Sequence, residues 1–237
     1  MAFYFNRAGF LKTGILGFFL LASGSLRAAL VSYSAEFPAT DPGSYQATAW
    51  DQTLSVPQFD PRLGRLEGVT ILLEAAISVT QGYENLSHRP GTIHLTDQGT
   101  VSLSFGRDTL LTDHLQVSGT YHAAGYDGHL DFGGTSGATI RGLTDQETRS
   151  VAFNSQRRTS PFVGHGNVNF DVQAEANDFF SDHDGHFAAF GLTSAWGEVS
   201  VLYDFIPVPE TSTIWVGIGA IILLAAIWGR RAGQFFR

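Results

Sequence analysis

The chain has 237 residues, which is enough for one domain of ordinary size with short appendages. It contains no cysteine, and this excludes a disulfide framework, a thiolate metal site and a cysteine nucleophile. The formal charge of −8 argues against nucleic-acid binding, because a basic surface supplies most of the affinity for nucleic acids.

Charge is distributed unevenly along the chain. The one lysine is Lys12, and three arginines lie in the last eight residues. Between Ala29 and Ile206, eight arginines stand against 21 aspartates and glutamates, a balance of −13. An acidic, lysine-free middle between two short basic and apolar ends predicts an exported protein with a membrane-directed tail.

Residues 1–28 have the pattern of a secretory signal peptide. Arg7 and Lys12 precede an uncharged apolar run at 13–24, and small residues follow it. The run is short for a membrane span, so we expect cleavage between Ser25 and Ala29. The alternative is an uncleaved N-terminal anchor.

Alternating apolar and polar residues predict β-strands within residues 29–206. The clearest alternation lies at 69–79, 168–176 and 199–205, with shorter strands expected at 31–37, 101–105 and 115–121. The stretch at 133–158 has the weakest strand pattern and leaves room for a long loop. Many strands separated by turns predict an all-β domain, an antiparallel β-sandwich of jelly-roll-like type.

Three segments of this middle region carry a family pattern. They are VPQFDPRLGRLEGVTILLEAAI at 56–77, FVGHGNVNFDVQAEA at 162–176 and GEVSVLYDF at 197–205. Together they resemble choice-of-anchor E domains, which implies an extracellular, all-β module at 29–206 and no known activity. In FDPRLG, Asp60 can accept from backbone N–H groups just downstream, Pro61 fixes φ and Gly64 permits a turn. This segment is predicted to shape a loop that enters the next strand.

Residues 207–237 combine a short linker with a motif, an apolar run and a basic tail. The motif is Val208, Pro209 and Glu210, and 19 uncharged residues follow at 211–229. As a helix this run would be about 28 Å long, close to the hydrocarbon thickness of a bilayer. Arg230 and Arg231 open the basic tail at 230–237 and predict a cytoplasmic stop-transfer end, with the domain outside. The alternative is a buried core helix, which the lack of an amphipathic face disfavours.

The motif, the single span and the terminal arginines, in this order, resemble a PEP-CTERM sorting signal. The resemblance implies cleavage near Pro209 and Glu210 by an exosortase, an integral-membrane cysteine protease. It also implies display or release outside the cell, often alongside exopolysaccharide. Thr211 stands where the commonest form of the signal has a second proline.

The best polar cluster is SDHDGH, with Asp182, His183, Asp184 and His186. Alternate oxygen ligands before a glycine resemble the start of a Ca²⁺ loop, and the two histidines could add nitrogen ligands. The third acidic position and the distal glutamate of an EF-hand are missing, so a solvated turn is the alternative. No other cofactor is expected.

Signatures of catalysis are missing from the sequence, which contains neither HExxH nor a G-x-S-x-G elbow. We therefore expect a non-enzymatic protein of the bacterial envelope or extracellular matrix, surface-anchored or released through its tail. The alternative is a secreted carbohydrate-binding or polysaccharide-active protein, the latter needing two carboxylates across a cleft. Candidate sugar platforms are Trp50, Trp196, Tyr83 and Tyr126. A permanently anchored adhesin is a third option.

Overall fold

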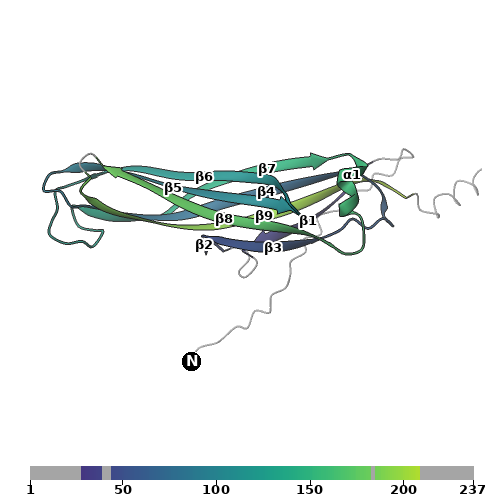
Figure 1. The fold of residues 1–237 in the computed structure, drawn as a ribbon, viewed down its shortest axis with the longest axis horizontal. Coiled ribbons are helices and arrows are strands. Elements are labelled where there is room, and N and C mark those ends of the chain that lie inside the picture. Colours follow the sequence, from purple (N-terminus) through teal and green to yellow (C-terminus); the bar gives the residue numbers. More distant parts are fainter. Residues whose placement is uncertain (1–27, 39–43, 183–184, 209–237) are drawn as a thin grey trace, which may run out of the picture.

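The computed structural model describes residues 28–38, 44–182 and 185–208. They form an elongated sandwich of two antiparallel sheets (Figure 1). One sheet has the strand order β1-β9-β4-β7, with the short β2 also paired to β9, and the other has the order β3-β8-β5-β6. The predicted all-β antiparallel sandwich is confirmed. Among the described residues, no helix has the length and apolarity that a bilayer crossing requires.

The element bounds follow in chain order. The strands are β1 (Ala29–Phe37), β2 (Gln46–Ala47), β3 (Trp50–Pro57), β4 (Gly64–Asn85), β5 (Gly91–Phe105), β6 (Asp108–Ala123), β7 (Gly137–Phe153), β8 (Asn167–Asp182) and β9 (Phe187–Pro207). Between β7 and β8 lie a one-turn helix α1 (Gln156–Thr159) and a 3-10 turn η1 (Ser160–Phe162).

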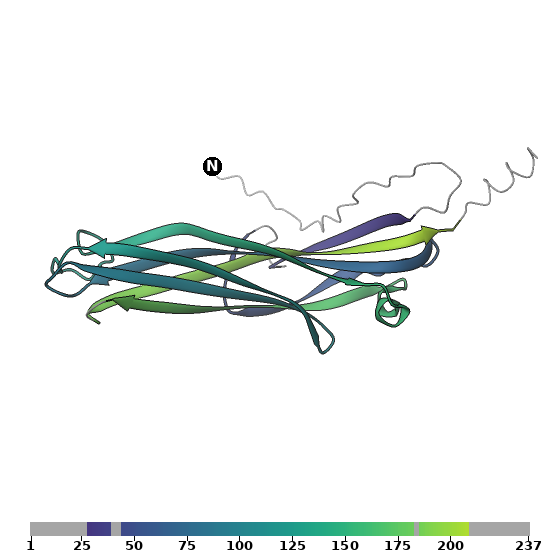
Figure 2. The same cartoon turned by 90° about the horizontal axis from the view of Figure 1, so that it is seen from above.

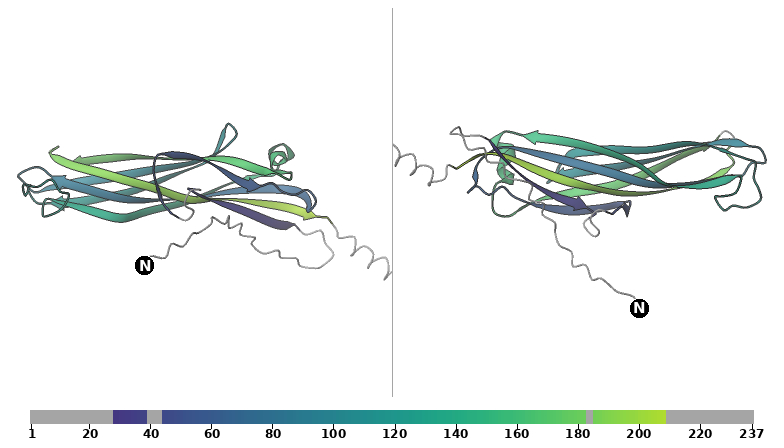
Figure 3. Two further views of the ribbon diagram at one scale, coloured as in Figure 1. Left: turned by 90° about the horizontal axis from the view of Figure 1, so that it is seen from below. Right: turned by 180° about the vertical axis from the view of Figure 1, so that it is seen from behind.

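Strand pairing is nested, because strands from the two halves of the chain pair with each other. The nested antiparallel pairs are β1 with β9, β3 with β8, β4 with β7, and β5 with β6, and the sheets are completed by β4 with β9, β5 with β8 and β2 with β9. Ala29 lies opposite Phe205, so the first and last strands begin and end side by side. We call this the proximal end; it also carries the loops at 58–63 and 154–166, and the β5–β6 turn at 106–107 lies in the same half of the sandwich, set back from the end (Figure 2). The loops at 86–90 and 124–136 form the distal end (Figure 3).

Burial follows the alternation expected from the sequence. The odd-numbered residues of β4 from Val69 to Val79 are buried, and so are the odd-numbered residues of β9 from Val199 to Phe205. These side chains belong to one large core between the sheets. A second, smaller apolar cluster lies toward the distal end around Tyr83, Ile93 and Leu95. Apolar burial on this scale is the main stabilising term of the sandwich.

β7 occupies the stretch in which the sequence left room for a long loop, so that expectation is wrong. Its pattern is weak because β7 is an edge strand whose side chains are mostly polar or half-buried. Contacts with neighbouring strands, rather than an alternating pattern in its own sequence, stabilise β7 as a strand. The carboxylates of Asp145 and Glu147 accept from the backbone N–H groups of Gln116 and His114 on β6, at 2.8 and 3.3 Å. These bonds close one edge of the sandwich.

Candidate functional site

Most of the sorting signal lies outside the described residues. Val208 is the last residue described; it is exposed, and its backbone N–H donates to the carbonyl of Leu63 at 3.1 Å. Pro209, Glu210, Arg230 and Arg231 lie beyond it, as do residues 1–27 of the predicted signal peptide. The function of both ends therefore stays a prediction.

The predicted metal cluster is described only in part. His183 and Asp184 lie outside the described residues. The side chain of Asp182, at the end of β8, accepts from the backbone N–H of Gly185, as in a turn. The carbonyl of His186 accepts from the backbone N–H of Leu86 at 2.9 Å and joins two distal loops. Among the described residues, no three His, Asp or Glu side chains are grouped to hold a metal ion.

The aromatic residues proposed as sugar platforms lie largely inside. Trp50 is buried against Phe37, with ring centroids 5.8 Å apart, and Tyr83 is buried in a stack with Tyr121 at 5.0 Å. Trp196 and Tyr126 are half-buried. Phe179, which the sequence reasoning did not single out, has 57% of its surface exposed.

The outward face of the sheet β3-β8-β5-β6 is a regular array of polar side chains, and we call it the polar face. On β5 and β6 its residues are serines, threonines, glutamines and histidines, with no aspartate, glutamate, lysine or arginine among them. They are Thr92, His94, Thr96, Gln98, Thr100, Ser102, Ser104, Thr109, Thr112, His114, Gln116, Ser118, Thr120 and His122. All of these side chains are exposed or half-buried, so this part of the face is open to solvent.

Facing side chains on the polar face hydrogen-bond across the two strands. Along the β5–β6 pair the contacts are Thr92–His122 and His94–Thr120 at 3.0 Å, Thr96–Ser118 at 3.1 Å, Gln98–Gln116 at 2.9 Å and Ser104–Thr109 at 3.3 Å. Cross-strand pairs of this kind stabilise a sheet and fix the rotamers of both partners. The face therefore presents ordered donors and acceptors rather than freely rotating side chains.

β8 adds an aromatic ring and carboxamides to this array. Phe179 lies in register with Thr96, and in the neighbouring row Asn177, Gln98 and Gln116 follow one another across three strands. An exposed ring can stack on the C–H face of a pyranose, while carboxamides match its hydroxyl groups as both donors and acceptors. Asp171 and Glu175 lie further along β8 on the same face. A shallow hollow of about 440 Å³ includes Asp171.

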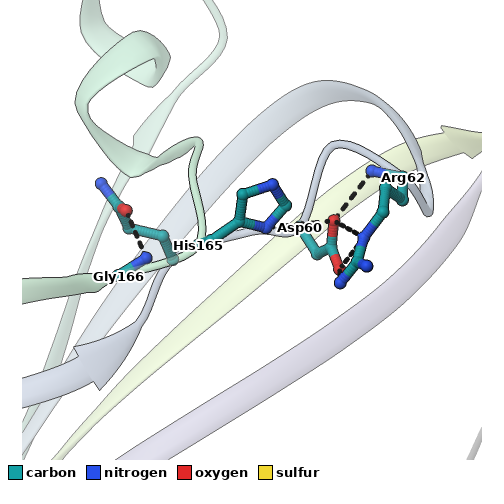
Figure 4. Close-up of polar contacts among 5 residues, drawn as sticks. Asp60, Arg62, His165 and Gly166 are labelled. Atoms are coloured by element: carbon teal, nitrogen blue, oxygen red, sulfur yellow. Dashed lines mark hydrogen bonds and ion pairs between the residues drawn. The ribbon is translucent and has the colours of Figure 1, made fainter.

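In the FDPRLG loop, Asp60 is bonded as its sequence predicts (Figure 4). The carboxylate of Asp60 accepts from the backbone N–H of Arg62 at 2.9 Å and pairs with its guanidinium at 2.6 Å. These hydrogen bonds to Arg62 lower the pKa of Asp60 to about 2. His165 Nδ1 is 3.6 Å from the same carboxylate. Gly64 meets a close approach rather than a turn, because a Cβ there would overlap the carbonyl oxygen of Ile206.

The FDPRLG loop also joins two of the three segments that carry the family pattern. Phe59 and Val163 form a parallel bridge, and the backbone N–H of Phe59 donates to the carbonyl of Phe162 at 2.8 Å. The side chain of Gln58 accepts from the backbone N–H of Gly166 at 3.0 Å. The contacts are between neighbouring protein groups, so the loop has a structural role.

Two carboxylates meet where β5, β8 and β9 approach one another. Asp97 has no accessible surface, while Asp178, its partner in register, is exposed. Gln81 donates to one oxygen of Asp97, and Tyr121 donates to Gln81 Oε1 at 2.8 Å. The other oxygen, Oδ1, has no hydrogen-bond partner among the described residues. Burial, with a contribution from Asp178, raises the pKa of Asp97 to about 6.

A second buried carboxylate lies near the β6–β7 edge. Asp113 has no accessible surface, and Arg149 Nε is 3.0 Å from its Oδ1. Burial and the nearby Glu147 raise the pKa of Asp113 to about 6 in spite of that arginine. Neither Asp97 nor Asp113 faces a cleft, so neither matches the pair of opposed carboxylates that glycoside hydrolysis requires.

Comparison with known proteins gives few matches. No family model and no curated protein matches the chain. Solved structures of infectious bursal disease virus are similar over 89% of this chain for the Gx strain and 88% for the Gt strain. The sequence identities are 12% and 13%, with TM-scores of 0.19 and 0.16. The chain spans about half the length of those chains, 49% and 46%.

Proposed function

We propose that this chain is an exported, non-enzymatic protein of the bacterial envelope or extracellular matrix. Its sandwich would be a jelly-roll-type module that binds neutral polysaccharide through the polar face, and its tail would be a PEP-CTERM-like sorting signal. The observation that carries the binding function is the uncharged hydrogen-bonding ladder on β5 and β6.

The chemistry of the polar face favours a neutral ligand. The region 29–206 carries a balance of −13, so a polyanion would be repelled unless divalent cations bridge the two. The β5–β6 part of the face, in contrast, is a surface of hydroxyl, carboxamide and imidazole groups. Sugar hydroxyls donate and accept in the same way, and Phe179 supplies the apolar contact.

The boundaries of the sandwich support the proposed export and sorting. β1 begins at Ala29, directly after the predicted signal peptide, and β9 ends at Pro207, directly before the Val-Pro-Glu motif. The strand orders β1-β9-β4-β7 and β3-β8-β5-β6 in the two layers support the jelly-roll type. On this proposal an exosortase is the partner that processes the tail, and the membrane is the partner that holds it before cleavage.

Binding is favoured over polysaccharide cleavage because of where the surface carboxylates lie. Asp171 and Glu175 follow one another at alternate outward positions on β8, rather than opposing each other across a cleft. Glycosidases place their two carboxyl groups on opposite sides of the scissile bond. The binding assay described below should therefore also measure whether the polysaccharide is cleaved.

Affinity electrophoresis of the mature protein in gels containing neutral glucans tests the binding function. We expect retardation, weakened about two- to tenfold by Phe179→Ala, as for loss of one aromatic contact. Gln98→Ala combined with Gln116→Ala should weaken it further. Leu192→Ala, an equally exposed apolar residue on β9, is the matched control. Unretarded migration in every neutral glucan would refute the glycan assignment, and release of reducing ends would show an enzyme.

The intact mass of the protein from its own cells tests the sorting function. A species that ends near Pro209 to Thr211, and that is lost in a Glu210→Ala variant, would support processing of the tail. A species that keeps Arg237 in both strains would instead indicate a permanent single-span anchor. The two assays are independent, because the first concerns only the sandwich.

A further inference from the structure

We propose that the proximal end of the sandwich is a docking surface for anionic lipid headgroups. This inference rests on the proposed function, in that the tail must hold the domain at a membrane before any cleavage. The partner is the bilayer itself, and the contacts would come from arginines and exposed apolar side chains at 58–63, 105–108 and 154–166.

The covalent tether places this end close to the bilayer. Val208 is fixed to the domain through its hydrogen bond to Leu63, and the uncharged run begins at Thr211. Three residues of fully extended chain reach at most about 10 Å. An anchored chain therefore keeps the proximal end within about one headgroup layer of the lipid, while the loops at 86–90 and 124–136 lie at the opposite end.

Most arginines of this acidic domain lie at or near the same end. Five of the eight arginines between 29 and 206 lie here, namely Arg62, Arg65, Arg107, Arg157 and Arg158. Arg62 and Arg65 are paired with Asp60 and Glu67 at 2.6 and 2.8 Å. The other three have no carboxylate within ion-pair distance among the described residues.

Two of the three unpaired arginines, Arg157 and Arg158, line one mostly apolar hollow. A depression of about 500 Å³ is lined by the aromatic residues Phe105, Phe153 and Phe162 and by the charged residues Arg157, Arg158 and Asp108. The guanidinium of Arg158 lies 4.6 Å from the centre of the Phe153 ring. Arg107 lies next to this hollow in sequence, in the β5–β6 turn between the lining residues Phe105 and Asp108. Aromatic carbon beside guanidinium groups suits a boundary where acyl chains meet phosphates.

Exposed apolar side chains extend this surface toward the chain ends. Four of the nine large hydrophobic residues that are exposed in the described part of the chain lie here: Leu30, Leu63, Val163 and Val208. An acidic peptide could pair with the arginines, but it would leave these apolar side chains in water. An anionic bilayer can pair with the arginines and also bury the apolar side chains, and the tether holds the bilayer at high effective concentration.

The test uses the full-length chain reconstituted into vesicles of 70% phosphatidylcholine and 30% phosphatidylglycerol that contain headgroup spin-labelled lipid. The chain has no cysteine, so one fluorophore can be attached at a single introduced thiol. Leu63→Cys reports on the proximal end and Leu130→Cys, at a residue that is also exposed, on the distal end. We expect strong quenching at residue 63 and little at residue 130. Flotation of the same vesicles reports separately on the anchor.

Charge removal tests the role of the arginines. In the Arg107→Ala, Arg157→Ala, Arg158→Ala variant, quenching at residue 63 should fall, since each arginine near an anionic surface shifts docking by about fivefold. Arg107→Ala alone should give a smaller fall without disturbing α1. The matched control is Arg89→Ala with Arg141→Ala, away from the proximal end.

The outcomes separate this inference from the proposed function. Flotation with equal quenching at residues 63 and 130, or with quenching that the arginine substitutions leave unchanged, would overturn the docking surface while the anchor stands. Loss of flotation would overturn both, because the domain would then have no tether. Quenching on pure phosphatidylcholine equal to that on the anionic vesicles would also refute recognition of anionic headgroups.

Discussion

Replacing Asp97 with asparagine is expected to stabilise the protein at neutral pH, although the substitution removes a buried hydrogen-bonded side chain. Asp97 lies between the sheets with one oxygen bonded to Gln81 and the other facing Asp178 without a donor. An asparagine can still accept from Gln81, and its N–H₂ group can donate to Asp178. The variant therefore keeps the existing bond and supplies the missing donor.

The magnitude follows from the pKa of Asp97, which burial raises from 3.8 to about 6. Below pH 3.8 the carboxyl is protonated in both the folded and the unfolded chain, so its ionisation costs nothing. Between pH 3.8 and 6 the unfolded chain loses the proton first, so the free energy of unfolding falls as the pH rises. Above pH 6 the loss is complete, and about two pKa units correspond to an upper bound of about 3 kcal/mol.

Urea unfolding followed by tryptophan fluorescence from pH 3.5 to 8 measures this difference. We expect wild type and Asp97→Asn to coincide near pH 3.5 and to diverge by 1–3 kcal/mol at pH 7. Asp113 remains in the variant, and its pKa is also raised to about 6, so the free energy of unfolding of the variant should still fall in part as the pH rises. Asp51→Asn, an exposed acid on β3, is the control and should change stability by less than about 0.5 kcal/mol. A variant less stable than wild type at pH 7 would show that the ionised carboxylate supports the fold, against this reasoning.

Three further substitutions test the packing around the buried polar groups. Gly191→Ala should destabilise the fold by about 1–3 kcal/mol in the same unfolding assay, because its Cβ would overlap Oδ1 of Asp97. Ser136→Ala should cost about 1–3 kcal/mol, since it removes the donor to the fully buried carboxyl of Glu84. Tyr203→Phe should cost about 1 kcal/mol, measured as a shift in the urea midpoint, because the hydroxyl donates to the carbonyl of Pro57 at 2.8 Å.

The long strand β4 could be predicted because its buried positions are apolar, whereas β3, which buries Trp50, Leu54 and Val56, was not expected. In β4 every inward residue from Val69 to Val79 is apolar, and the prediction of that strand was correct over its core. In β5 the expected strand covered only 101–105, although β5 begins at Gly91. The inward positions at the missing part include Asp97 and Gly99, which break the hydrophobic period. The first part of β5 was therefore missed because a buried carboxylate, Asp97, occupies one of its inward positions.

The candidate binding surface was hidden for a related reason. Outward residues of a strand are free to be any polar type, so serine, threonine and glutamine at alternate positions carry no signal until the strand order is known. The order β3-β8-β5-β6 brings Asn177, Gln98 and Gln116 into one row, although they lie up to 79 positions apart in sequence. In contrast, the Asp60 turn depends on residues two positions apart, and local chemistry predicted it.

The buried polar layer has a further consequence for how the sandwich assembles. Gln81, Asp97 and Tyr121 lie on three strands between the large core and the distal apolar cluster. A slip of one residue in any of these strands would turn its polar side chain outward and an outward residue inward. Because Gln81 is bonded to both of the others, only one combination of registers satisfies all three side chains. The polar layer therefore fixes the register of β4, β5 and β6 although the ionisation of Asp97 lowers the stability of the fold at neutral pH. Because β5 and β6 carry the polar face, the same layer also fixes which residues that face presents.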